Sequence, residues 1–209
     1  MSPSTSEKCA GDRLPPDFVF SSTDDFYYGP SMCALMHYRT GSAVVAIIEF
    51  LFQITYLTVA VYLHQERHSV DFSVIGVILL VTVASTVCSV ALFWGLYTEQ
   101  AKMIKPKLFL LQLQICFLLA LATLAIIAMS IGIEATNSLF GTFLRPEVME
   151  KDFGPIWPFN ISVLAFFSAA IGIWMQVISR GAYDFLMDKE YFTRTPNHTI
   201  QMEKKNRNE

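Results

Sequence analysis

One acidic side chain stands inside an apolar stretch that is long enough to cross a membrane. Glu49 lies in "SAVVAIIEFLFQITYLTVAVYL", and Gln53 and Tyr56 follow it at four and seven residues. This spacing puts the three side chains on one face of a helix. A charged acid at such a depth costs on the order of a few kcal/mol, so it usually turns inward and pairs. A carboxyl group beside an amide and a phenol has the chemistry of a proton or cation site.

Two interpretations of Glu49 stay open. In the first, the protein is a small proton-coupled transporter that uses Glu49, with Gln112 or Gln114 contributed from a similar depth. In the second, Glu49 makes a structural hydrogen bond that knits helices together. The second is favoured because no second acid or basic partner is evident in the membrane segments. In addition, the predicted helices are not broken by an internal proline, whereas transporter sites are typically formed by helices that are broken within the membrane.

The composition indicates an integral membrane protein. The 209 residues are 53% hydrophobic and only 16% charged, whereas about 25% charged is usual in soluble domains. Four segments reach the roughly 20 apolar residues that a spanning helix needs. The sequence therefore predicts an all-α fold, an integral membrane four-helix bundle with helices at about 41–63, 72–97, 107–133 and 156–179.

Basic residues near the helix ends predict the orientation. Lysine and arginine are enriched on the cytosolic side of membrane helices, and here the ends that share this enrichment carry His37, Arg39, Lys102, Lys105, Lys107, Arg180 and Lys189. Both termini are therefore expected in the cytosol. This predicts a disordered arm over residues 1–32, a membrane domain over 33–180, a luminal loop over 134–155 and a tail over 181–209. Trp157 is expected in the aromatic belt at the luminal interface.

The entry to the first helix carries a recognisable pattern. In "CALMHYRTGSAVVAIIEF", Cys33 precedes His37, Arg39, Thr40 and Gly41. This stretch resembles the corresponding entry in the lysosome-associated protein transmembrane family, and the four-helix layout is similar too. The resemblance implies a late-endosomal or lysosomal membrane protein without catalysis or cofactor, whose partners are membrane lipids and other membrane proteins. The chain departs from that family in having one cysteine where a run is usual, and in lacking Pro-Pro-x-Tyr motifs in its tail.

A sorting signal is suggested by "AYDFL" after the fourth predicted helix. Tyr183 and Leu186 have the three-residue spacing of a tyrosine motif that binds clathrin adaptors as an extended segment. The alternative is an interfacial tyrosine on a helix that continues outward.

Other chemistry finds little support in the sequence. It contains no glycine-rich phosphate loop and no paired metal-ligand spacing, and His64 and His68 stand beside Glu66 with no cluster to complete a site. No basic stripe predicts nucleic-acid binding. The expected function is non-catalytic regulation or trafficking of other membrane proteins or lipids. A structural tetraspan that organises lipid is a further alternative, as is residence in the plasma membrane.

Overall fold

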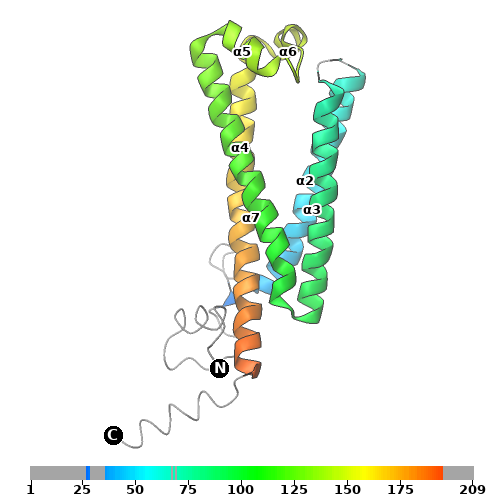
Figure 1. Ribbon diagram of the computed structural model, residues 1–209, viewed down its shortest axis with the longest axis vertical. Coiled ribbons are helices and arrows are strands. Elements are labelled where there is room, and N and C mark those ends of the chain that lie inside the picture. The colour runs from blue at the N-terminus through cyan, green and yellow to red at the C-terminus, as the bar shows by residue number, and fades with distance from the viewer. Residues whose placement is uncertain (1–26, 29–35, 67, 69, 195–209) are drawn as a thin grey trace, which may run out of the picture.

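The structure is a computed structural model that describes residues 27–28, 36–66, 68 and 70–194. Cys33 lies outside these ranges. From residue 36 onward the described chain is almost entirely helical (Figure 1). The elements are α2 (Tyr38–Gln65), α3 (Phe72–Thr98), the short 3-10 helix η3 (Ala101–Ile104), α4 (Lys105–Ile131), α5 (Ile133–Phe140), α6 (Pro146–Phe153) and α7 (Trp157–Arg194).

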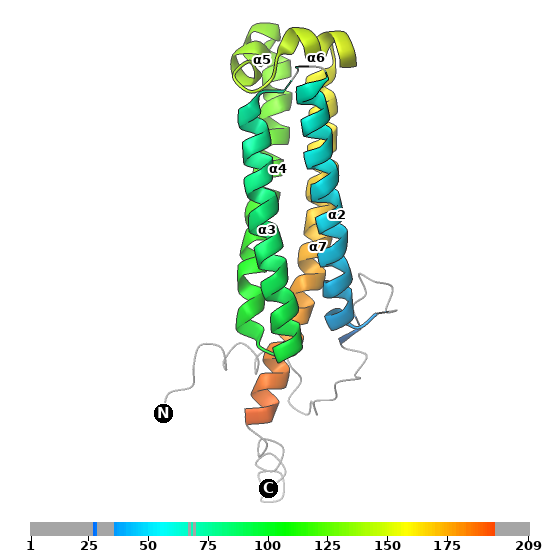
Figure 2. The same ribbon diagram turned by 90° about the vertical axis from the view of Figure 1, so that its right-hand side faces the viewer.

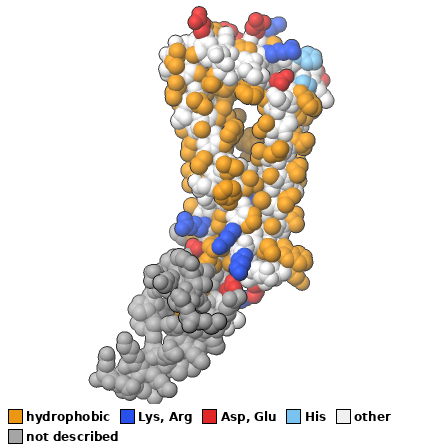
Figure 3. All heavy atoms as spheres, viewed as in Figure 1, with side chains coloured by type: hydrophobic (Ala, Val, Ile, Leu, Met, Phe, Trp, Pro, Cys, Tyr) orange, Lys and Arg blue, Asp and Glu red, His pale blue; other side chains and the backbone are white. Residues whose placement is uncertain are grey.

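Four of these helices are long and apolar enough to cross a membrane: α2, α3, α4 together with η3, and α7. A helix satisfies its own backbone hydrogen bonds, which is what a chain in hydrocarbon requires. Hydrophobic side chains cover the middle of the molecule, whereas charged side chains gather at its two ends (Figure 3). The all-helical fold and the integral membrane character predicted from composition are confirmed.

The helices form two antiparallel pairs, α2 with α3 and α4 with α7 (Figures 1 and 2). Helix α2 also packs against α7, and η3 makes the short turn from α3 into α4. The beginning of α2 and the end of α7 consequently lie at the same end of the bundle. Cys88 and Cys116, the cysteines within the described helices, are not disulfide-bonded.

The fourth spanning helix is longer than the sequence prediction. It was expected to end near residue 179, but α7 continues to Arg194. The extension packs because Ala182, Phe185 and Leu186 are buried in one cluster with Leu92 of α3 and Ile104 of η3. These apolar side chains pack the helix against the bundle beyond residue 180. Residues 181–194, which the sequence analysis places in the tail, are therefore part of α7.

Two short helices, α5 and α6, cap the other end of the bundle, where the sequence predicts a loop over residues 134–155 (Figure 2). The two apolar side chains Phe140 and Met149 form a cluster there with Trp157. Trp157 is 4% exposed, and its ring meets Phe140 edge-on with centroids 5.4 Å apart. The cap therefore covers the Trp157 ring, which packs against Phe140, and the depth of Trp157 in the membrane stays a prediction.

Candidate functional site

The acid inside the membrane segment has a basic partner. The Lys107 ammonium nitrogen lies 2.7 Å from Oε2 of Glu49, and both side chains are buried, at 1% and 8% exposure. The two residues come from different helices, since Glu49 lies in α2 and Lys107 in the first turn of α4. A buried charge needs a counter-charge and hydrogen bonds, and this ion pair supplies the counter-charge.

The position of Lys107 differs from the prediction, which counted it among the residues that mark the cytosolic boundary. A lysine near a helix end normally extends its stem so that the ammonium group reaches water. Here the side chain points into the bundle instead. Lys102 and Lys105, in the same connection, remain exposed. Contrary to the expectation from the sequence, Glu49 therefore has a basic partner within the membrane segments, Lys107.

Two serines of α3 complete the surroundings of Lys107. Its ammonium group donates to the hydroxyl oxygens of Ser85 and Ser89, each at 2.9 Å. The ion pair with Glu49 and these two hydrogen bonds together surround the buried ammonium group. The sequence prediction did not include Ser85 or Ser89 in the site. Their spacing of one helical turn was the available sign of a polar face directed at a shared partner.

Glu49 is bound by hydroxyl and amide donors as well. Its Oε1 accepts from the Ser85 hydroxyl at 2.7 Å and from the Gln53 amide at 3.0 Å. Ser85 therefore accepts from Lys107 and donates to Glu49 in the same ring of contacts. The result is a compact group without net charge, the intramembrane cluster Glu49, Gln53, Ser85, Ser89 and Lys107, which joins α2, α3 and α4. Its one buried oxygen without a hydrogen-bond partner or counter-charge is Oε1 of Gln53.

The other residues proposed as partners of Glu49 lie elsewhere. Tyr56 shares a hydrogen bond of 2.9 Å with Ser168 of α7. Gln112 accepts a hydrogen bond from Gln176, also of α7. Gln53 is therefore the only predicted companion that contacts Glu49 in the described structure.

The helix-entry motif of His37, Arg39, Thr40 and Gly41 lies at the N-terminal end of α2. His37 caps the helix, since its Nδ1 accepts from the backbone N–H of Arg39 at 3.1 Å. Arg39 in turn donates to the carbonyl oxygen of Leu96 at 2.8 Å and lies 3.5 Å from the Glu99 carboxylate. Gly41 is buried and Thr40 is exposed. The motif thus serves to cap α2 and to tie it to the end of α3.

Glu99 binds a second cation at that end. Lys189 of α7 donates to its carboxylate. The hydrogen bond from Lys189 is the main cause that holds the pKa of Glu99 below its usual value, and burial opposes the shift. Arg39, Glu99 and Lys189 form a boundary network that joins α2, the turn after α3 and α7.

The proposed sorting residues lie within α7. Leu186 is fully buried, and the ring of Tyr183 lies under the Lys105 ammonium group, 5.9 Å from the ring centroid. An adaptor would need this stretch extended with both side chains accessible. In the folded helix that condition is not met, and the alternative of a helix that continues outward describes the structure.

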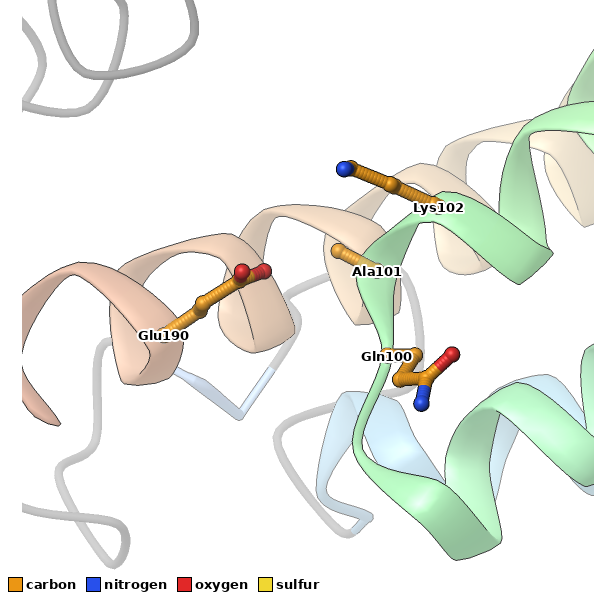
Figure 4. Close-up of a pocket in the computed structure, with 4 residues that line it drawn as sticks. All are labelled: Gln100, Ala101, Lys102 and Glu190. Carbon is orange, nitrogen blue, oxygen red and sulfur yellow. The ribbon is translucent and has the colours of Figure 1, made fainter. Parts of the chain in front are cut away.

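A small cavity of about 190 Å³ opens at the same end. It is lined by Gln100, Ala101 and Lys102 from the turn before and within η3, and by Glu190 from α7 (Figure 4). It lies apart from the intramembrane cluster. Among the described residues no group of three or more His, Cys, Asp or Glu side chains is placed to hold a metal ion.

Comparison with known proteins relates most of the chain to an animal protein. Protein cuti-1 of Caenorhabditis elegans is 40% identical over 194 residues, which cover 93% of this chain and 96% of that protein. No protein-family model matches the chain, and no solved structure matches it. Identity of this extent over nearly both full lengths shows common descent, and the chain belongs to the family of Protein cuti-1.

Proposed function

We propose that this protein is a non-catalytic four-helix membrane protein that binds and regulates, or traffics, other membrane proteins or lipids. In this proposal both termini are cytosolic and the intramembrane cluster holds the bundle together. The observation that carries the proposal is the pairing of Glu49 with Lys107. A carboxylate whose charge is matched inside the protein can tie helices to each other, and it offers no free acid for a transported ion.

The lipid-facing surface supports a binding role. Large apolar side chains on all four spanning helices are exposed, for example Phe109 and Leu80. They suit contact with acyl chains or with the spanning helices of other proteins. The small open cavity at the boundary offers little enclosure, whereas ligand sites usually bury most of a ligand's surface.

Transport is the competing function, and flux measurements separate the two. Purified protein in vesicles that contain a pH-sensitive dye should give the same proton leak as empty vesicles under an imposed pH gradient. Glu49→Gln should then lower the thermal stability of the protein and leave the proton leak unchanged. A wild-type proton flux that Glu49→Gln abolishes, with the helical content kept, would instead establish the transporter and defeat the structural role.

The compartment and the orientation need separate tests. Residence in late endosomes or lysosomes rests on the helix-entry motif, and a tagged chain should co-fractionate with those membranes. Residence only in the plasma membrane would remove the endolysosomal part of the proposal. For orientation, Asn197 belongs to the glycosylation sequon Asn-His-Thr and should stay unmodified in the cytosol. A glycan on Asn197 would reverse the proposed topology.

A further inference from the structure

Two amide side chains lie on the outer surface of the α4–α7 pair, in a region otherwise covered by apolar groups. Gln112 of α4 is exposed and Gln176 of α7 is half-buried. Gln112 is seven residues after Lys105, roughly 10 Å along the helix at 1.5 Å per residue. That distance places the amides past the basic boundary and among the acyl chains.

These amides are only partly satisfied within the chain. Gln176 donates to the amide oxygen of Gln112, and the Gln112 nitrogen makes only a long contact of 3.7 Å with the sulfur of Cys116. The amide oxygen of Gln176 has no hydrogen bond among the described residues. An unpaired amide is costly to transfer from water to an apolar medium. The surface therefore presents an unpaired amide N–H group and an unpaired amide oxygen close to each other.

Hydroxyl groups on the same face of α4 do not share this problem. Thr123 donates to the backbone carbonyl oxygen of Leu119, and Ser130 donates to that of Ile126. A glutamine side chain has both a donor and an acceptor at its tip, so an acceptor on its own backbone cannot satisfy it. The amides thus distinguish this face from the other exposed surfaces.

The exposed positions of this face form a continuous stripe along α4 on which a second helix can pack. Starting from Gln112, exposed residues recur at alternating steps of four and three, namely Gln112, Cys116, Leu119, Thr123, Ile126 and Ser130. This is the repeat by which two helices pack at a shallow left-handed angle. The inward face of α4 is already occupied, since Leu111 and Ile115 are buried.

We infer that this face of α4 binds α4 of a second copy of the protein. Both copies insert in the same orientation, so a two-fold axis along the membrane normal makes the two α4 helices parallel. An amide is donor and acceptor at once, and a two-fold partner therefore supplies both missing groups reciprocally. Interhelical amide contacts of this kind stabilise association in membranes. The inference is independent of the proposed function.

Cys116 allows a direct test, because the pairing brings each copy of it opposite the other. In a full-length chain with Cys9, Cys33 and Cys88 changed to serine, copper-phenanthroline oxidation in membranes should give a disulfide-linked dimer on a non-reducing gel. Moving the single cysteine to position 123, seven residues on, should preserve the cross-link. Moving it to position 117, which is exposed about 100° further round the helix, should abolish it.

The amides are tested by affinity. In fluorescence energy transfer between labelled copies diluted in vesicles, Gln112→Leu with Gln176→Leu should weaken dimerisation by about three- to tenfold, the range expected from membrane hydrogen bonds. Gln114→Leu is the matched control on another face and should change it little. Energy transfer that stays at the random-collision level at every density would overturn the inference. So would equal cross-linking at positions 116 and 117, or cross-links only to a protein of different mass.

Discussion

Two networks of charged groups lie within one bundle and differ in what surrounds them. The intramembrane cluster is sealed, with Lys107 only 1% exposed, whereas Glu99 in the boundary network keeps 40% of its side chain exposed. Water can replace any partner lost from the boundary network. Nothing can replace a partner lost from the sealed cluster, so the same chemical contact has different energetic weight in the two places.

The comparison also separates two uses of charge. In the boundary network Arg39 and Lys189 hold a carboxylate where helices leave the membrane, consistent with the entry motif as a helix cap. In the intramembrane cluster one lysine and one glutamate fix how α2, α3 and α4 approach each other. Removing one group from each network should therefore give effects of very different size.

Lys107→Met should have the largest effect of any single substitution considered. It leaves the Glu49 carboxylate buried without a counter-charge, and breaking a buried pair in this way costs roughly 3–5 kcal/mol. Denaturant unfolding in detergent micelles measures the loss. Lys102→Met, an exposed lysine in the same connection, should be nearly neutral. Equal stability of the two variants would refute the special weight of the sealed cluster.

Ser85→Ala should have an intermediate effect. The hydroxyl both accepts from Lys107 and donates to Glu49, and a buried group left unsatisfied costs about 1–3 kcal/mol. Ser89→Ala removes a single acceptor of Lys107 and should cost less by the same unfolding measurement. If Ser89→Ala were the more damaging of the two, the bridging role assigned to Ser85 would be wrong.

Glu99→Gln should have the smallest effect, within about 1 kcal/mol at neutral pH, as is usual for exposed ion pairs. The difference from wild type should shrink in high salt. Because the folded protein lowers the pKa of Glu99, its stabilisation is fully present above the ordinary value of 4.5 and is lost as pH falls through the lower folded pKa. Thermal unfolding of both proteins between neutral and acidic pH should therefore converge, and a gap that widens in acid would contradict this assignment.

The sequence predicted the four spanning helices because each is a long apolar run, a signal carried by local composition. It also predicted that Glu49 and Gln53 would share a face, since both lie in one helix. The partner Lys107 could not be found in this way. A lysine near a helix end is expected at the boundary, and its inward direction depends on how α4 packs against α2 and α3.

Of two further differences, only one has a local signal in the sequence. Ala182, Phe185 and Leu186 recur at helical spacing past the expected end of the fourth helix, which indicates that the helix continues with one apolar face. Burial of Trp157 had no such signal, because it depends on α5 and α6 folding over the end of the bundle. Local patterns thus predicted the elements, while contacts between distant residues decided the site.

The most direct test of the structural role is a double-mutant cycle on Glu49 and Lys107. The variants Glu49→Gln, Lys107→Met and the double substitution would be compared with wild type by unfolding in micelles, together with proton leak in vesicles. We expect each single variant to be strongly destabilised, the double variant to be more stable than Lys107→Met alone, and the leak to be unchanged throughout. Additive losses, or full stability combined with a lost proton flux, would contradict the account.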